Sequence, residues 1–236
     1  MTSEIKFRSD MTVELVDSMG GDEAVVRSAR VSTSSDSRNV DMGTKEEGLI
    51  NYLMRDRHGS PFEHNAFTFF IEAPIFVFRE FMRHRIASYN EESARYKELA
   101  PVFYVPGDGR KLIQVGKPGA YTFEDGDYAQ IKSAQALTRL ASERSYELYK
   151  KMLSDGIARE VARGVLPVNT YSSMYVTMNA RSMMNFLSLR TMREGTHFPS
   201  FPQREIEMVA EKMEEFFAEK MPITYATFNK NGRVAP

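Results

Sequence analysis

The longest regular pattern in the sequence is one amphipathic helix over residues 127–153, which a glycine at position 156 brings to an end. Shorter helical patterns are expected at 24–30, 44–57, 75–82, 158–165, 180–190 and 203–220. Strand-like stretches rich in β-branched and aromatic residues are confined to 12–16, 65–73 and 170–178. Because helices and a few strands follow each other without regular alternation, the sequence predicts α+β architecture. We expect a single domain over residues 1–236, with a small, mostly antiparallel sheet and several long helices.

Local signals indicate where helices start and where loops run. Asp22 is placed to cap the first helix, and Thr44 with Glu47 has the spacing of a capping box for the second. Residues 32–41 are rich in Ser, Asp and Asn, and residues 102–123 in glycine, proline and charge, so both are expected to be loops.

The balance of charge limits the kinds of partner. With 31 basic and 32 acidic side chains, no bulk field would hold the chain on a nucleic acid or an anionic membrane. The richest apolar stretch, 66–78, is interrupted by Glu72 and Pro74 and is too short to span a bilayer. The first residues lack the pattern of a secretory signal. We therefore expect a cytoplasmic protein with neither nucleic-acid nor membrane partners.

The sequence contains no cysteine, which excludes disulfides, cysteine-ligated metals and every thiolate nucleophile. His58 and His64 lie six residues apart, but no H-E-x-x-H pair accompanies them. We expect no metal site.

Residues 83–96 concentrate the polar chemistry of the chain. Pro74 is expected in the first turn of a helix whose C-terminal end delivers Arg83, His84 and Arg85. Guanidinium groups suit phosphate because their planar fork donates paired hydrogen bonds at fixed charge, so a nucleotide phosphate is the natural ligand.

Two alternatives to a phosphate site remain for this segment. In the first, its basic residues complement the dipole of a solvated helix end. In the second, the segment binds nucleic acid through stacking of Tyr89 and Tyr96, which the neutral overall charge disfavours.

Arg83-His84-Arg85, followed by seven residues and then Ser93, resembles the signature of flavin-dependent thymidylate synthases. The resemblance extends in order from about residue 29 to residue 190. Its other blocks are 29–32 (Ala-Arg-Val-Ser), 58–64 (His-Gly-Ser-Pro-Phe-Glu-His), 159–167 and 179–190.

That resemblance implies conversion of dUMP to dTMP, with methylenetetrahydrofolate as the one-carbon donor and FADH2 as the hydride source. NADPH regenerates the reduced flavin, and tetrahydrofolate is the product left behind. It also implies a homotetramer with shared active sites. Classical thymidylate synthases use a cysteine nucleophile, which this chain lacks. The chemistry is therefore expected to come from FAD, while the protein binds and orients the ligands and places charged side chains around them.

The resemblance also implies which residues meet each ligand. The FAD-binding positions are Ser32, His58, Ser60, Glu63, Arg83, His84, Arg85, Asn179, Arg181 and Asn185. The dUMP-binding positions are Glu80, Glu91, Ser93, Ala94, Arg95, Arg163 and Arg190. Asn179 also has a simpler interpretation as the cap of the following helix.

Ser93 and Arg190 are the expected catalytic residues. Ser93 is favoured as a hydrogen-bonding contact to the substrate over a nucleophile, since the segment supplies no convincing partner base. Arg190 taken alone would be interpreted as a helix C-cap or a surface ion pair.

Two departures from the family pattern stand out. Ala94 occupies a position where glycine is common, which matters only if the backbone needs a positive φ or a very close contact. The segment 191–202 is longer than the family pattern, in which a histidine follows soon after the arginine, and His197 is a candidate to replace that histidine. The contacts of folate and NADPH are not placed by the sequence.

Overall fold

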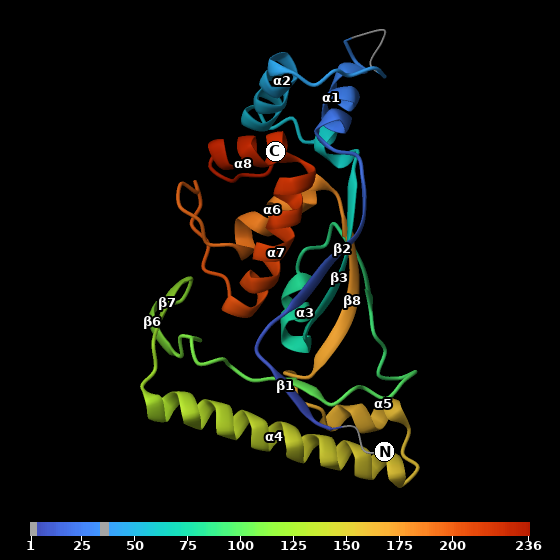
Figure 1. Cartoon of the computed structure of the whole chain (residues 1–236), viewed down its shortest axis with the longest axis vertical. Coiled ribbons are helices and arrows are strands. Elements are labelled where there is room, and N and C mark those ends of the chain that lie inside the picture. Colours follow the sequence, from blue (N-terminus) through green and yellow to red (C-terminus); the bar gives the residue numbers. More distant parts are fainter. Residues whose placement is uncertain (1–3, 34–37) are drawn as a thin grey trace. The chain divides into compact units, whose positions relative to one another are not determined.

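The computed structural model describes residues 4–33 and 38–236 and confirms the α+β architecture (Figure 1). Residues 34–37 of the expected loop 32–41 lie outside the described part. The chain forms two compact units. Unit 1 comprises Met1–Thr12, Glu72–Phe81 and Asn90–Met174. Unit 2 comprises Val13–Ile71, Met82–Tyr89 and Tyr175–Pro236.

The strands form one four-stranded sheet and two strand pairs. The larger sheet has the order β2 (Thr12–Met19), β3 (Ala66–Pro74), β8 (Tyr171–Met178) and β4 (Ser88–Glu91). In β3 the side chains of Phe67, Phe69 and Ile71 are fully buried, which confirms the predicted alternation. β1 (Lys6–Arg8) pairs in parallel with β5 (Val102–Tyr104), and β6 (Ile113–Lys117) pairs antiparallel with β7 (Ala120–Glu124).

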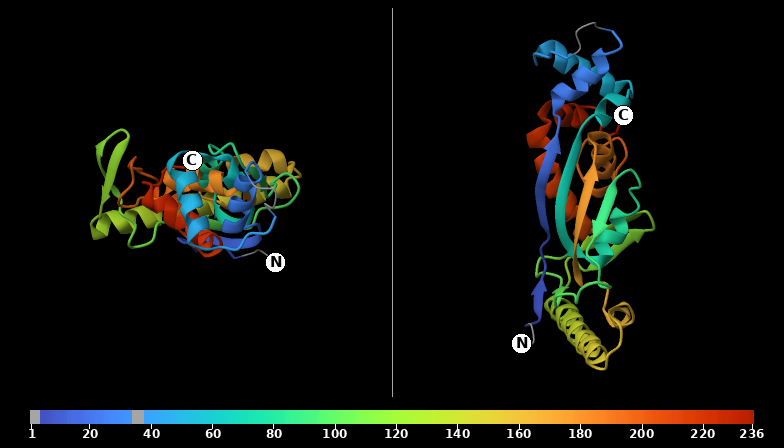
Figure 2. Two further views of the ribbon diagram at one scale, coloured as in Figure 1. Left: turned by 90° about the horizontal axis from the view of Figure 1, so that it is seen from above. Right: turned by 90° about the vertical axis from the view of Figure 1, so that its right-hand side faces the viewer.

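Unit 1 is organised around the long helix α4 (Tyr128–Ser154). The Asp127 carboxylate accepts from the Gln130 backbone amide at 2.8 Å, and Gln130 Oε1 accepts from the Asp127 backbone amide at 2.8 Å, so a capping box starts the helix. Tyr146 and Tyr149 are buried on one face of α4 with Phe103 of β5 and Ala162 of α5 (Arg159–Ala162). Both Figure 1 and the right-hand view of Figure 2 show α5 beside α4. The predicted helix over 127–153 is confirmed.

Unit 2 packs its helices around an aromatic core. These helices are α1 (Asp22–Arg30), α2 (Thr44–Arg55), α6 (Ala180–Arg190), α7 (Arg204–Lys220) and α8 (Pro222–Lys230). Phe217 of α7 is fully buried and meets the ring edge of Phe67 at 5.9 Å between centroids.

Both helix caps predicted near the N-terminus are wrong. The N-cap of α1 is Gly21, and the buried Asp22 instead accepts from the amides of Ile223 and Thr224, each at 2.9 Å, and from the Thr224 hydroxyl at 2.6 Å. Asp22 therefore caps α8, a helix that is distant in sequence. The N-cap of α2 is Gly43, with no side-chain cap bond, so Thr44 and Glu47 form no capping box.

The expected loop over 102–123 is also wrong, since β5 and β6 and most of β7 lie in it. Helix α8 and strand β1 were not predicted. A short helix α3 (Ile75–Phe81) follows Pro74, which is the last residue of β3 instead of part of the helix. Arg83 to Arg85 lie in the turn after α3 and not on the helix. No helix in the described ranges is long and apolar enough to cross a membrane.

Candidate functional site

Unit 2 contains a cavity of about 670 Å³ whose wall carries the expected basic motif. It is lined by Arg57, Glu63, Arg83, His84, Arg85, Ile86, Met178, Arg181, Ser182, Asn185, Leu189, Arg190, Ala235 and Pro236. Five arginines face one glutamate, so the wall is strongly cationic, while the aliphatic side chains supply apolar surface. The volume falls within the range of small-molecule and cofactor sites. The cavity can therefore hold an anionic ligand that also has a flat apolar part.

The centre of this wall is a hydrogen bond between Arg190 and His84. Arg190 Nε donates to His84 Nε2 at 3.0 Å, and the edge of the His84 ring meets Phe186 at 4.9 Å between centroids. Burial, followed by the positive charge of Arg190, lowers the pKa of His84 to about 4. His84 is consequently a neutral imidazole at physiological pH, and because Nε2 accepts, the proton resides on Nδ1.

Tyr89 fixes the backbone of the same turn. Its hydroxyl donates to the His84 carbonyl oxygen at 2.6 Å. Burial raises the pKa of Tyr89 to about 12, so the phenol stays protonated and this bond persists at any physiological pH.

Arg181 closes another part of the cavity wall. Its NH1 group donates to Glu63 Oε1 at 2.5 Å, and its Nε donates to the Pro236 backbone oxygen at 2.6 Å. Gly59 packs so closely that a Cβ there would lie 2.5 Å from Arg181 Cζ and 2.8 Å from the Pro236 oxygen. Glycine is required here by this close approach.

Six of the ten expected FAD-binding residues line the cavity, namely Glu63, Arg83, His84, Arg85, Arg181 and Asn185. Ser32, His58, Ser60 and Asn179 do not line it, and their role stays a prediction. His58 directly precedes Gly59 and stacks on Tyr52 at 5.5 Å between ring centroids. Asn179 accepts from the Ser182 amide at 2.9 Å and therefore caps α6, as its simpler interpretation requires.

All of the expected dUMP-binding residues except Arg190 belong to unit 1. Arg95 Nε donates to Glu160 Oε2 at 2.9 Å, with both side chains about half exposed. Arg163 lies three residues after Glu160, at the start of the 3-10 turn η2 (Arg163–Val165), and is exposed.

Ser93 contacts the backbone of Arg95. Its Oγ accepts from the Arg95 amide at 3.3 Å, which leaves the hydroxyl proton available for donation to a ligand. Its carbonyl oxygen accepts from the amides of Tyr96 and Lys97 at 3.1 and 3.2 Å, so the turn is rigid. Ala94 is buried and does not have a positive φ, and alanine therefore satisfies this backbone.

Two carboxylates accompany the segment. Burial raises the pKa of Glu91, against a hydrogen bond from Ser172 that lowers it, while the charge of Glu92 adds to the rise. Glu80, in α3, is half-buried in the same unit, and its role stays a prediction.

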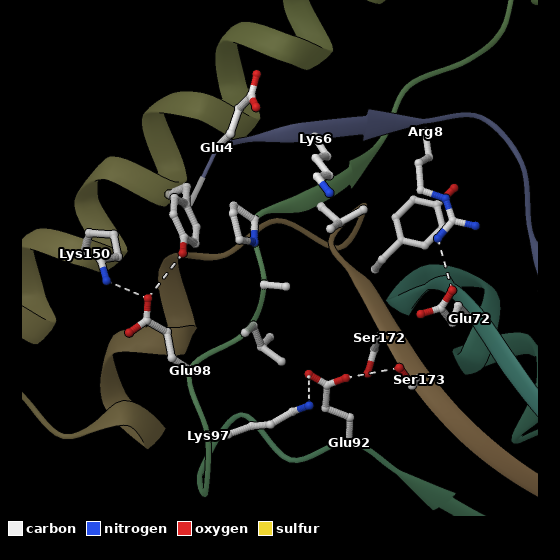
Figure 3. A pocket seen from close by; sticks show the side chains of 16 residues that line it. Glu4, Lys6, Arg8, Glu72, Glu92, Lys97, Glu98, Lys150, Ser172 and Ser173 are labelled. Atoms are coloured by element: carbon white, nitrogen blue, oxygen red, sulfur yellow. Dashed lines mark hydrogen bonds and ion pairs between the residues drawn. The ribbon is translucent and has the colours of Figure 1, made fainter. Parts of the chain in front are cut away.

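Unit 1 also contains a larger cavity, of about 800 Å³ (Figure 3). Four acidic and four basic side chains line it, and six of them form pairs: Lys97 meets Glu92 at 3.2 Å, Lys150 meets Glu98 at 2.6 Å, and Arg8 meets Glu72 at 3.2 Å. A phosphate would have to displace these carboxylates, so this cavity is a poorer anion site than the one in unit 2.

His197 lies in the segment between α6 and α7 and is exposed. Its amide donates to the Gly232 carbonyl oxygen at 2.8 Å, and its ring meets the Phe198 edge at 4.5 Å between centroids. It does not line the unit 2 cavity, and its correspondence to the histidine of relatives stays a prediction.

Sequence reasoning missed several cavity residues. Arg57 was not predicted as a site residue, and its position directly before His58 was the only local signal. In the structure it adopts a positive φ of 63°, which is uncommon for a side-chain-bearing residue. Ala235 and Pro236 carry no chemical signal, and only the tertiary fold brings them to the wall.

The fold and the cavity define an α+β protein with a cationic, partly apolar site, which suits a nucleotide-type ligand. A family model described as thymidylate synthase complementing protein matches residues 14–223. Flavin-dependent thymidylate synthases from Streptomyces avermitilis and Tropheryma whipplei are 61% and 57% identical to this chain. Each alignment covers 98% of this chain, and 95% and 97% of the respective relative. The chain belongs to the flavin-dependent thymidylate synthase family.

Solved structures agree with that membership. A UMP/dUMP methylase, PolB from Streptomyces cacaoi, bound with 5-Br dUMP, is 53% identical and superposes with a TM-score of 0.94 over 98% of this chain and 100% of that one. The same protein bound with 5-Br UMP gives a TM-score of 0.92 over 99% of this chain and 100% of that one.

Proposed function

We propose that this chain is a flavin-dependent thymidylate synthase that methylates dUMP to dTMP without a cysteine nucleophile. FAD is its cofactor, methylenetetrahydrofolate its one-carbon donor and NADPH its reductant. Family membership supports the reaction class. The absence of cysteine from the sequence excludes a thiolate nucleophile, and the flavin dependence of the relatives supports a flavin as the source of redox chemistry.

The observation that carries this proposal is the cavity of unit 2, where Arg83, His84 and Arg85 meet Arg181 and Arg190. The guanidinium groups suit a pyrophosphate, and Ile86, Met178 and Leu189 suit the face of an aromatic ring system. FAD, when bound there, supplies the hydride. Cationic side chains beside it would stabilise the negative charge of the reduced form.

Neutral His84 has a definite task in this proposal. It accepts a hydrogen bond from Arg190 at 3.0 Å, which orients the guanidinium without cancelling its positive charge. A carboxylate at this position would neutralise Arg190 and weaken its attraction for an anion. The pair therefore keeps a full positive charge in a defined direction.

Substrate recognition is assigned to Glu91, Ser93, Ala94, Arg95, Arg163 and Arg190, with Glu80 in a supporting position. Arg95 and Arg163 would neutralise the phosphate dianion, while the Ser93 hydroxyl donates to it or to the base. The surface pair between Arg95 and Glu160 is weak and can give way to a phosphate.

The homotetramer with shared active sites is part of the same proposal, and α4 supports it. Leu137, Leu140 and Leu148 occupy one face of this helix and are 63%, 63% and 42% exposed. The opposite face is already buried through Tyr146 and Tyr149. An exposed leucine face on a helix whose other face is already packed suits contact with another subunit.

The test is purification of the protein, a visible spectrum, and tritium release from 5-tritiated dUMP with methylenetetrahydrofolate and NADPH. The expected result is a yellow protein whose activity needs all three reactants. A colourless protein that FAD does not reconstitute would exclude the flavoenzyme.

The assay is run in parallel with UMP, because the Streptomyces cacaoi protein is described as a UMP/dUMP methylase and is 53% identical. Turnover of UMP at a rate comparable with dUMP would widen the substrate class to both nucleotides. Turnover of dUMP alone would restrict it to the deoxynucleotide.

A further inference from the structure

Arg190 is the last residue of α6, and the next residue, Thr191, is held by several hydrogen bonds. Thr191 is fully buried and has an extended backbone. Its amide and its hydroxyl both donate to the Leu187 carbonyl oxygen, at 3.0 and 2.7 Å. Its own carbonyl oxygen accepts from the Ser200 hydroxyl at 2.6 Å. The end of the helix therefore has little freedom.

The hydroxyl of Thr191 also accepts a hydrogen bond from Arg233, at 2.8 Å from NH2. Arg233 lies 42 residues later in the sequence and is only 4% exposed. Its NH1 group binds Glu214 Oε1 at 2.7 Å and Asn229 Oδ1 at 2.5 Å. A buried, bonded guanidinium is thus directed at the residue after Arg190.

The backbone of Arg233 is strained. Its φ is 57°, in the left-handed region that side-chain-bearing residues seldom adopt. Its Nε atom is buried and has no hydrogen-bond partner within the described ranges. Burying a charged arginine in this way is unfavourable unless the surrounding contacts compensate for it. Such a residue is better explained by a task than by stability alone.

Glu214 of α7 joins this contact to the segment that follows Arg190. One of its oxygens binds Arg233, and the other accepts from Arg193 at 2.7 Å. The amide of Met192 donates to Glu207 of the same helix at 3.0 Å. Helix α7 packs against both α6 and α8, so these bonds connect the segment after Arg190 to the end of α8 through α7 (Figure 1).

We propose that Arg233 is a positioning residue that acts through Thr191 to hold Arg190 against His84 in the cavity. The inference rests on the proposed function, in which Arg190 binds dUMP. Arg233 itself does not line the cavity. Its effect on substrate is transmitted by the backbone at the end of α6.

The test compares Thr191→Val, which keeps the shape of the side chain but removes its hydroxyl, with Thr191→Ser, which keeps the hydroxyl. The matched control is Thr227→Val, since Thr227 is also buried and its hydroxyl donates to the Thr224 carbonyl oxygen at 3.0 Å. For each variant the flavin content, the melting temperature and the Kd for dUMP are measured, the last by equilibrium dialysis.

Thr191→Val is expected to bind dUMP roughly tenfold more weakly, while Thr191→Ser recovers most of the affinity. Thr227→Val is expected to lower the melting temperature as much as Thr191→Val does, but to leave the affinity for dUMP unchanged. Arg233→Lys should weaken dUMP binding, and its effect should not add to that of Thr191→Val, because both act on the same contact.

Arg190→Ala distinguishes a failure of the positioning inference from a failure of the proposed function. If Arg190→Ala weakens dUMP binding but Thr191→Val behaves like Thr227→Val, the positioning inference fails and the proposed function stands. If Arg190→Ala binds dUMP as the parent does, the assignment of Arg190 fails and the positioning inference fails with it. Additive effects of Arg233→Lys and Thr191→Val would likewise overturn transmission through Thr191.

Discussion

Removing Glu160 is expected to strengthen dUMP binding, because this carboxylate competes with the phosphate for Arg95. The two side chains form a single hydrogen-bonded ion pair at 2.9 Å, and each is 54% exposed. Pairs of this kind contribute about 0 to 1 kcal/mol. Glu160→Gln should therefore raise the affinity for dUMP by up to about fivefold.

Arg95→Ala should have the opposite effect. Loss of a charge-assisted hydrogen bond to phosphate costs about 1.5 to 3 kcal/mol, which corresponds to a roughly 10- to 150-fold weaker Kd. The flavin content of both variants should equal that of the parent, since neither residue lines the cavity of unit 2. The measurement is equilibrium dialysis with labelled dUMP at about 0.15 M salt, where the screening length is about 8 Å.

Glu147→Gln is the matched control for the change in net charge. Glu147 holds Arg144 on α4 in a surface pair of the same length, 2.9 Å, and neither residue is assigned to the site. It should leave dUMP affinity unchanged. The reasoning is refuted if Glu160→Gln weakens dUMP binding as Arg95→Ala does, since Glu160 would then be part of the binding site. Loss of flavin from Arg95→Ala with unchanged dUMP affinity would reverse the assignment of the two sites.

Three further predictions concern stability and cofactor retention. Asp22→Ala should lower the free energy of unfolding in urea by about 2 to 4 kcal/mol, because three hydrogen bonds to α8 are lost. Asp22→Asn should retain about half of that stabilisation. Equal losses of stability in the two variants would exclude the cap. Because the pKa of His84 is lowered to about 4, the unfolded chain binds more protons between pH 4 and 6.5, so stability should fall as the pH drops through this window. The full shift corresponds to about 3 kcal/mol, which solvent screening at this half-buried side chain reduces to roughly 1 kcal/mol, and His84→Gln should remove this component. Gly59→Ala should displace Arg181 and lower the flavin retained after purification, while Gly48→Ala, with open space around it, should retain the parent's flavin content. Equal flavin in both glycine variants would contradict the close-approach argument.

The sequence predicted the regular elements well where local pattern decides the structure. The amphipathic period of α4 and the alternation in β3 are both properties of neighbouring residues, and both were confirmed. Strand β1 could not be found in this way, because its three residues pair with β5 almost a hundred positions away. The hairpin of β6 and β7 did carry a usable signal, since Pro118 and Gly119 form its turn and Gly119 has a φ of 84°.

Helix caps show why a correct residue type can be given the wrong partner. Asp22 has the chemistry of a cap and sits at the start of α1, yet its carboxylate binds the first turn of α8. No local pattern distinguishes these two uses, because the choice depends on where α8 packs. Pro222 at the first position of α8 was a usable signal for that helix.

The candidate site was predicted in part for similar reasons. The motif around Arg83 and His84 is contiguous in sequence and could be recognised, and the cavity of unit 2 contains it. The bond between His84 and Arg190 joins residues 106 positions apart and followed from no local pattern. Likewise, the hydrogen bond from Arg181 to the Pro236 backbone oxygen depends on the fold of the C-terminal segment.

A single-turnover experiment tests the central claim most directly. The protein carrying reduced flavin is mixed without oxygen with dUMP and methylenetetrahydrofolate, and flavin absorbance and dTMP are followed together. The account predicts that dTMP forms as the flavin becomes oxidised, with one dTMP for each flavin. Formation of dTMP while the flavin remains reduced would contradict it.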